Sequence, residues 1–277
     1  MSYDKPVSVD FSAYKHLLLD LDDGVLTITL SNPGKKNAVT PEMSAELSTI
    51  WEHCWLSDDV SVVVLTGDGN DFCSGVDLVG LNAAYDTGAP KRTAVVNPTT
   101  RSARKHVYGI MDCEKPIIAK VRGVAYGMGV NMALACDMVF VSENARLCDS
   151  HVKAGMVAGD GGVLLWPLLC GIHRAKEYLM TGEPIAGPDA ERIGLVNRCL
   201  PDAELDSHVA EMARKLRDLP PHAVNYTKSS INIAVRQMTQ SAFEASVAYE
   251  IYTMGMEDFR EATSAFKDKR KGRFTGS

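Results

Sequence analysis

The first part of the chain alternates apolar and polar residues as β-strands do. Residues 16–21 and 25–30 alternate around Asp23-Gly24, a dipeptide typical of tight hairpin turns. Three later runs are mostly apolar and rich in branched residues, as in strands buried on both faces: 61–66 (SVVVLT), 116–121 (PIIAKV) and 138–141 (MVFV). The pattern predicts an opening hairpin followed by buried strands.

Apolar residues at helical spacing separate and follow these runs. Thr40-Pro41-Glu42 supplies an N-cap, a proline at the first helical position and an acidic first turn, and predicts one helix of about four turns that ends near Trp55. Further helices are predicted at 99–113, 128–136, 163–170, 175–181, 189–193, 202–217, 221–238, 241–254 and 258–270.

Strands and helices alternate before Gly161, and helices dominate after it. We therefore expect an α/β fold in which residues 1–200 form a β/α core that carries the active site and residues 201–277 form an all-helical C-terminal region. Between the strands, residues 79–98 have weak periodicity and contain Gly88, Pro90 and Pro98, which predicts a mobile insertion near the site.

Composition narrows the class of protein. A net charge of −6 argues against nucleic acid or an anionic membrane as the main partner. The seven cysteines are odd in number and form no C-x-x-C pair, so they predict reduced thiols rather than a disulfide framework or a metal site. No apolar run approaches the ~18 residues of a membrane helix, and the N-terminus has no signal-peptide core. We expect a soluble, cytoplasmic protein.

The stretch 121–162 carries the candidate chemistry. It contains a glycine-rich turn, VRGVAYGMGVNMALACD, and a loop that holds His151 and Asp160. Glycines let the backbone pass close to a ligand, and a helix beginning at Met128 or Gly129 directs free amides toward an anion. Each glycine alone is equally explained as a turn residue, and Asp160 precedes a helical run as an N-cap does. Together they predict an active site.

Six motifs then occur in a recognisable order: LSNPGKKNAVTPEM, VVVLTGDGNDFCSGVDL, KPIIAKVRGVAYGMGVNMALACDMVF, ARLCDSHVKAGMVAGDGG, AKEYLMTGEPIAGPDAERIGLVNRCLP and EDFREATSAFKDKRKGRF. Over nearly its whole length the chain resembles the crotonase (enoyl-CoA hydratase/isomerase) superfamily. The resemblance implies a crotonase-like spiral of β-β-α units, a homotrimer or dimer of trimers, and a C-terminal region for oligomerisation and pocket closure. It implies no bound cofactor, with coenzyme A entering as part of the substrate.

The same resemblance assigns roles to individual residues. It implies an oxyanion hole made by the backbone amides of Ser74 and Met128, which would stabilise the charge of a thioester enolate. Lys36, Phe266 and Lys269 match positions that contact CoA in relatives, although exposed lysines are often only solvated.

The chain departs from the hydratases of this superfamily at two positions. They use two glutamates, and Asn131 and His151 stand in those places here. An amide cannot act as a general base, so hydration by a glutamate pair is put in doubt. Asn131 is equally explained as a pocket hydrogen-bond donor and as a packing residue.

The loop D-x-H-x-x-x-G-x-V-x-G-D-G resembles that of oxocamphor hydrolase, a relative that cleaves a carbon–carbon bond in a cyclic β-diketone. Carried over by position, His151 becomes the general base and Asp160 the carboxylate that orients it. Glu250 falls near an acidic pocket residue of that relative. Asp77 and Asp149 are further pocket candidates, with a loop-fixing role and an outward side chain as their respective alternatives.

Three functions follow from these observations. The first is an enzyme that acts on an acyl-CoA or β-dicarbonyl substrate through an enolate, with hydrolytic C–C cleavage. The alternatives are an enoyl-CoA hydratase or double-bond isomerase, and a crotonase-fold binding protein without activity. If His151 is the base, activity should fall as it becomes protonated near its ordinary pKa of ~6.5.

Overall fold

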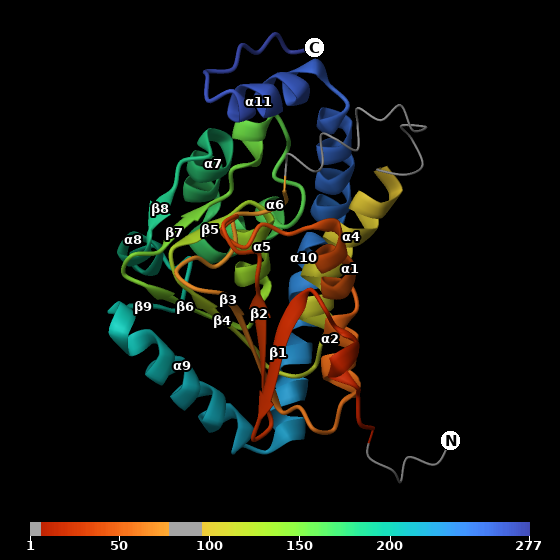
Figure 1. Cartoon of the computed structure of the whole chain (residues 1–277), viewed down its shortest axis with the longest axis vertical. Helices are drawn as coiled ribbons and strands as arrows, with labels where there is room; N and C mark the ends of the chain where they lie inside the picture. Colours follow the sequence, from red (N-terminus) through yellow and green to blue (C-terminus); the bar gives the residue numbers. More distant parts are fainter. Residues whose placement is uncertain (1–6, 78–95) are drawn as a thin grey trace.

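A computed structural model describes residues 7–77 and 96–277 of the protein. Two β-sheets form its centre (Figure 1): a larger one with the strand order β1-β2-β3-β4-β6-β9 and a smaller one with the order β5-β7-β8. The strands are β1 (Leu17–Asp22), β2 (Val25–Leu30), β3 (Val62–Gly67), β4 (Ile117–Val121), β5 (Val124–Tyr126), β6 (Met138–Ser142), β7 (Arg146–Cys148), β8 (Ile185–Ala186) and β9 (Arg198–Leu200).

The predicted opening hairpin is confirmed. β1 and β2 pair antiparallel with Asp22 opposite Val25, and Asp23 and Gly24 take positive φ angles of 46° and 77° in the turn. The other pairs of the larger sheet, from β2-β3 to β6-β9, are parallel. Among them, β3, β4 and β6 are buried along most of their length, in agreement with their apolar runs.

Successive strands enter different sheets, and this produces a spiral. β4 joins the larger sheet and β5 the smaller one before helix α5 (Met128–Ala135); β6 and β7 repeat the pattern before α6 (Gly162–Cys170). The expected α/β class and β-β-α spiral are therefore confirmed. As a consequence, the loops that follow β5 and β7 lie side by side: the amide of Gly127 donates to the carbonyl of Cys148.

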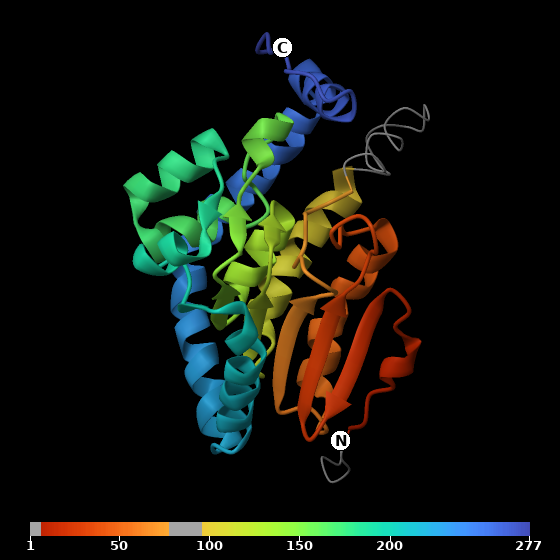
Figure 2. The ribbon, with the colours of Figure 1, turned by 60° about the vertical axis from the view of Figure 1, so that its left-hand side comes forward.

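The two faces of the larger sheet serve different layers. In β3, Val63 and Leu65 belong to the main hydrophobic core, whereas Val62 and Val64 pack in a separate cluster with Leu205 and other residues of α9 (Asp202–Arg217). This follows from the period of two in a strand. Figures 1 and 2 show α9 covering that face of the sheet.

The helices largely follow the predicted pattern. The remaining helical elements are η1 (Phe11–Ala13), α1 (Pro41–Leu47), α2 (Ile50–Leu56), α4 (Val96–Asp112), η2 (His151–Ala154), α7 (Ile172–Thr181), α8 (Gly187–Arg192), α10 (Pro221–Met254) and α11 (Glu257–Lys267). Most of the insertion predicted at 79–98 lies outside the described residues. Every helix in the described ranges is too short or too polar to span a lipid bilayer.

Some predicted boundaries were wrong. The single helix expected after Thr40 is two helices, α1 and α2, because the hydroxyls of Ser48 and Thr49 bond the carbonyls of Ser44 and Glu46 and compete with the backbone. The helices predicted at 221–238 and 241–254 are one helix, α10. The short strands β5, β7, β8 and β9 were missed, since two or three residues carry too little periodicity to be recognised.

The long helix α10 connects the C-terminal region to the core. It packs along α4 and α6, and Figure 1 shows it running most of the length of the molecule, with α11 at its far end. The ion pair between Lys228 and Asp137 fixes its first half, and its second half carries the buried Glu250. The division into residues 1–200 and 201–277 stays a prediction.

Candidate active site

His151 lies between two carboxylates. Asp149 leaves the end of β7, and its Oδ1 lies 2.6 Å from Nδ1 of His151 and accepts the His151 amide at 3.3 Å. On the other side of the ring, Nε2 lies 3.2 Å from Oδ2 of Asp160. All three side chains are buried. The alternative of an outward Asp149 side chain is therefore excluded by its contacts.

Asn131 joins the two carboxylates from the opposite side. It lies in the first turn of α5, and its Nδ2 donates to Oδ2 of Asp149 at 3.0 Å and to Oδ1 of Asp160 at 2.7 Å. Among the described residues its Oδ1 has no partner. The side chain of Asp160 points to Asn131 and His151. The N-cap position of α6 is occupied by Gly161, and no side chain caps the helix there. The geometry thus gives Asp160 a place in the cluster rather than an N-cap.

Glu250 completes the cluster from α10. Its Oε1 lies 4.0 Å from Nε2 of His151, and the residue is only 6% exposed. Gly159 makes room for it, since a Cβ atom there would lie 2.5 Å from Oε2 of Glu250. A residue 99 positions along the chain from His151 is thereby brought against the same imidazole.

The pKa values of these groups are displaced in different directions. Burial opposes the charged form of His151, but the charges of Asp160 and Asp149 outweigh it and raise its pKa well above the usual range. Burial likewise opposes ionisation of Asp160, and the bonds and charge of His151 overcome it and lower the pKa of Asp160. Burial, reinforced by the charge of Asp160, raises the pKa of Glu250 to about 8.

These shifts correct the expected role of His151. An imidazole that faces a carboxylate at each nitrogen donates from both, and it is therefore an imidazolium at neutral pH. It cannot then be a resting general base with an ordinary pKa. The displaced pKa values favour an ionised Asp160 beside a protonated His151 and a protonated Glu250.

A cavity of about 280 Å³ opens beside the cluster. His151, Asp160 and Glu250 lie on its wall with Ser150. The rest of the lining is mostly apolar and comes from several elements: Val39, Pro41, Val76, Ala103, Met128, Ala154, Met156 and Met254. Asp77, a predicted pocket residue, also lines the cavity, and its amide donates to the carbonyl of Val39. The predicted pocket residues Asn131 and Asp149 do not line it, but they bond the side chains of Asp160 and His151, which do.

The glycine-rich turn places a free amide at this cavity. Met128 is the first residue of α5, so its amide has no helical acceptor, and no bond of it to a described residue is found. Gly75, with φ of 93°, brings the other loop close: a Cβ on it would lie 3.7 Å from the Met128 nitrogen.

The assignment of Ser74 to the oxyanion hole is wrong in this structure. Its amide donates to the carbonyl of Lys36 at 2.9 Å and its hydroxyl to that of Lys35 at 3.0 Å. Val76, two residues on, forms a parallel bridge with Val39 in which Gly75 and Asp77 make the bonds, and its own amide bonds no described residue. Sequence reasoning missed Val76 because the motif alone does not show which amide the loop leaves free.

The predicted CoA contacts lie at the surface. Lys36 has a positive φ of 49°, is largely exposed, and approaches Asp71 at 3.8 Å. Phe266 lies exposed on α11, and Lys269 follows that helix. The structure brings neither into a described contact with Lys36, and their role stays a prediction.

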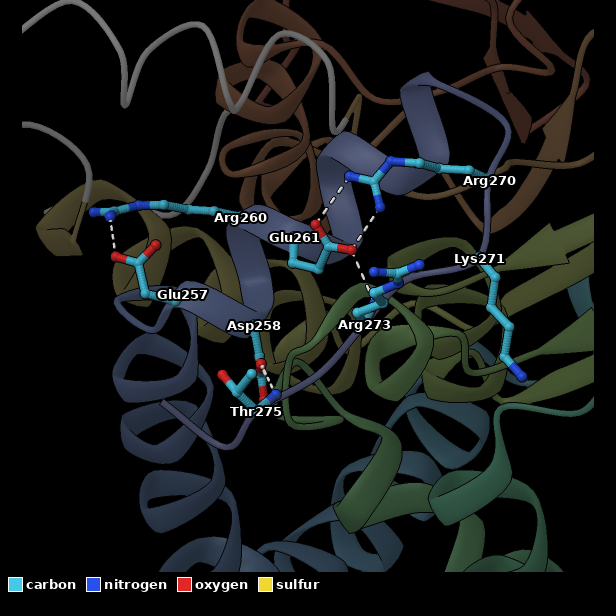
Figure 3. Close-up of a pocket in the computed structure, with 8 residues that line it drawn as sticks. All are labelled: Glu257, Asp258, Arg260, Glu261, Arg270, Lys271, Arg273 and Thr275. Carbon is cyan, nitrogen blue, oxygen red and sulfur yellow. Dashed lines mark hydrogen bonds and ion pairs between the residues drawn. The ribbon is translucent and has the colours of Figure 1, made fainter.

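A second, open cavity of about 690 Å³ lies between α11 and the C-terminal tail (Figure 3). Its acidic side chains are all bonded within it, and Glu257 pairs with Arg260. Arg270 bonds Glu261 through two nitrogens at 2.6 and 2.9 Å, and Asp258 accepts the amides of Thr275 and Gly276. These bonds hold the C-terminal tail on α11, and the residues that line this cavity include no buried titratable cluster.

The buried cluster fits a hydrogen-bonded triad better than a metal site. Asp149, His151 and Asp160 offer ligand atoms within 4.8 Å of one another. A metal needs an imidazole nitrogen free of a proton, whereas here Nδ1 and Nε2 each already face a carboxylate at hydrogen-bonding distance.

Comparison with known proteins identifies the family. The enoyl-CoA hydratase/isomerase family model matches residues 20–277. The chain belongs to this family. It is 30% identical to the 1,2-epoxyphenylacetyl-CoA isomerase of Escherichia coli over 94% of this chain and 98% of that protein. It is 28% identical to 4-chlorobenzoyl coenzyme A dehalogenase-2 of an Arthrobacter species, over 92% and 91%.

The fold agrees with solved members of the family. An enoyl-CoA hydratase/isomerase from Mycobacterium paratuberculosis superposes with a TM-score of 0.83 at 31% identity, covering 90% of this chain and 97% of that one. The expected superfamily and enzymatic nature are thus confirmed, and the names of the two relatives above specify CoA thioesters. These proteins catalyse different reactions, so membership alone leaves the reaction type open.

Proposed function

We propose that the enzyme hydrolyses a carbon–carbon bond of a β-dicarbonyl acyl-CoA thioester through an enolate. The observation that carries this proposal is the pair of carboxyl groups on one cavity wall, Asp160 held ionised and Glu250 held protonated beside the same imidazolium. Environments that push two carboxyl pKa values apart supply a base and an acid at one pH.

The steps use both groups in turn. Asp160 accepts a proton from water as the oxygen attacks the carbonyl remote from the thioester. The tetrahedral alkoxide collapses, the bond between that carbon and the α-carbon breaks, and its electron pair becomes the thioester enolate. Glu250 then gives its proton to the α-carbon, and the proton on Asp160 restores Glu250. One water is consumed, and a carboxylic acid and a shortened thioester are formed, or a single ring-opened acid from a cyclic substrate.

The enolate needs stabilisation at its oxygen. We assign this to the amides of Val76 and Met128, residues that line the cavity and whose amides bond no described residue. Two preorganised donors in a buried site are effective, and removal of one such donor costs about 3 kcal/mol in other enzymes. His151, fixed at Nδ1 by Asp149, keeps Asp160 ionised and aimed at the cavity.

The acyl group that this cavity accepts is cyclic or aromatic in our proposal. The lining is mostly apolar. The names of two relatives specify cyclic acyl groups, a 1,2-epoxyphenylacetyl and a 4-chlorobenzoyl thioester.

Isotope labelling tests the reaction type. The protein is incubated in ¹⁸O-water with a cyclic β-ketoacyl-CoA, the corresponding free β-diketone and crotonyl-CoA, and the products are identified by mass. We expect a ring-opened acid with one ¹⁸O from the thioester and none from an Asp160→Asn variant. Glu261→Gln, on the surface, is the matched control. Cleavage of the free diketone alone would remove CoA from the proposal.

Hydration or isomerisation is the second candidate, because the same acid and base can add water across a double bond or move a proton, and the Escherichia coli relative is an isomerase by name. Hydrated crotonyl-CoA as the sole product would establish it and refute hydrolysis. Failure of every substrate would favour the inactive binding protein, although such a protein has no need of a buried acid–base cluster.

We also propose that the protein assembles as a trimer or pair of trimers. Exposed apolar side chains support this, several of them on α10: Ile231, Ile233, Met238, Tyr249 and Tyr252. Light scattering after size exclusion gives the mass, and a monomer at micromolar concentration would refute it.

A further inference from the structure

Four side chains of the buried cluster form a closed ring of polar contacts. His151 faces Oδ1 of Asp149 at 2.6 Å and Oδ2 of Asp160 at 3.2 Å. The amide nitrogen of Asn131 donates to the remaining oxygen of each, Oδ2 of Asp149 at 3.0 Å and Oδ1 of Asp160 at 2.7 Å. Each carboxyl group is thus held at both oxygens, one by the imidazole and one by the amide, and it cannot rotate without breaking a contact.

The orientation of the Asn131 amide follows from its partners. Asp160 is held ionised by His151, and a carboxylate only accepts hydrogen bonds, so the nitrogen of Asn131 faces it. Both hydrogens of that nitrogen are then used, one on each carboxyl group. The opposite atom, Oδ1, is buried and has no partner among the described residues. Because an unpaired buried acceptor is destabilising, the two donors explain this residue better than packing does.

Asn131 also connects the proposed base to the proposed enolate site. It lies in the first turn of α5, three residues after Met128, whose amide we assign to the enolate oxygen. Residues three apart lie on the same face of a helix. The backbone amide of Asn131 donates to the carbonyl of Gly127 at 3.2 Å, so its main chain is fixed as well. The helix that presents an oxyanion donor therefore also holds the carboxylate that activates water.

Two glycines at the start of α6 leave room for the ring. A Cβ atom on Gly161 would lie 3.1 Å from Cβ of Asn131, and one on Gly162 would lie 2.1 Å from Oδ2 of Asp149. The second distance is a clash that only a movement of the Asp149 carboxyl group or of the helix could relieve. The backbone that follows Asp160 is thus shaped to the closed ring.

We propose that Asn131 is a positioning residue that closes this ring and thereby holds Asp160 in a fixed place relative to the enolate site. The inference rests on the proposed function of the cavity. Asn131 does not line the cavity, so it acts through Asp160 and not on the substrate. Loss of its donor should leave substrate binding intact, but it should let the base move.

Kinetics of Asn131→Ala test this role on the substrate that the labelling experiment identifies. We expect kcat to fall about 30-fold with KM nearly unchanged, since misplacement of a catalytic group by about 1 Å costs up to ~100-fold. In an Asp160→Asn background the same substitution should change the residual rate by less than about threefold, because its effect runs through Asp160. Asn232→Ala removes one amide bond to the carbonyl of Met111, outside the cluster, and is the matched control that should keep wild-type kcat.

A second readout does not depend on turnover. ¹³C NMR of the Asp160 carboxyl group, assigned by loss of its signal in Asp160→Asn, follows its protonation directly. Burial opposes ionisation of Asp160, and the contacts of His151 and Asn131 with the charge of His106 overcome it and lower its pKa, while Glu250 is the facing acid. Without the Asn131 donor the midpoint should move to higher pH, and the acid side of the rate profile should move with it, because the base works only when ionised. The control variant should keep both.

Wild-type kcat in Asn131→Ala, an effect on KM alone, equal losses in the two backgrounds or an unchanged Asp160 titration would each overturn the inference. Asn131→Asp decides if Asn131→Ala does not fold, as circular dichroism would show. It keeps the shape of the side chain, but a carboxyl group donates at most one hydrogen, so the ring opens and kcat should fall at least about tenfold; wild-type kcat would refute the role. If the wild type turns over no substrate, the proposed function fails, whereas the carboxyl titration still decides whether Asn131 holds Asp160.

Discussion

Two glutamates on the C-terminal helices show how the surroundings of one side chain set its use. Glu261 on α11 accepts two bonds from Arg270 and the amide of Arg273, and these lower its pKa to about 2. Glu250 on α10 lies 4.0 Å from the imidazole of His151, and burial, reinforced by the charge of Asp160, raises its pKa to about 8. The first is a structural anion at every physiological pH, and the second is an acid.

The largest effect should come from the base. Asp160→Asn keeps the shape of the side chain and its contact with Asn131 but removes the charge that accepts a proton, so we expect turnover to fall by about 10³-fold. Steady-state rates on the substrate that the labelling experiment identifies give the measurement. Glu261→Gln makes the same chemical change outside the cluster and should leave the rate unchanged. Wild-type turnover by Asp160→Asn would remove Asp160 from the mechanism.

Replacement of Asp149 should lower turnover by a smaller factor. Asp149→Asn weakens the 2.6 Å contact at Nδ1 of His151, whose ring keeps its partner Asp160 at Nε2. We expect a fall of about 10²-fold, below the ~10⁴-fold found when the carboxylate of a catalytic triad is replaced.

A second readout separates orientation from simple destabilisation. Loss of the Asp149 charge should lower the pKa of His151, which NMR of the imidazole follows directly. An unchanged His151 titration in Asp149→Asn would contradict the structure.

The sequence was informative about the site to different degrees. The loop motif identified His151 and Asp160, because both lie on one continuous stretch whose glycines and spacing are distinctive. It could not show that Asp149 rather than Asp160 takes Nδ1, since that depends on the side-chain direction two residues away.

The sequence also could not predict which backbone amide of the 74–77 loop is free, because this depends on contacts between distant segments. The fold class and the hairpin follow from periodicity and Asp23-Gly24, which are local signals. Which amide of the 74–77 loop is free depends on its bridge to Val39, a contact between segments far apart in the chain. Ser74 was therefore chosen where Val76 is the free donor.

The pH profile should reveal the acid. Because the pKa of Glu250 is raised to about 8, its proton is present below that pH and lost above it. Activity should fall about tenfold per pH unit on the alkaline side. Glu250→Gln should lower the rate and flatten this limb, and the limb should persist in Glu261→Gln. A wild-type profile without a decline between pH 7 and 9 would show that Glu250 is not the proton donor.

The smallest effect should come from Glu261. Its lowered pKa means that its bonds contribute stability above the unfolded-state pKa of ~4.3 and that this contribution is lost as the pH falls toward about 2. Glu261→Gln should therefore lower the melting temperature slightly at pH 7 and less at pH 3, because ion pairs at the surface contribute little. Thermal unfolding at both pH values checks this, and activity should not change. A marked loss of turnover would show that the cavity of Figure 3 takes part in substrate binding, and the contrast between the two glutamates would then no longer separate structure from function.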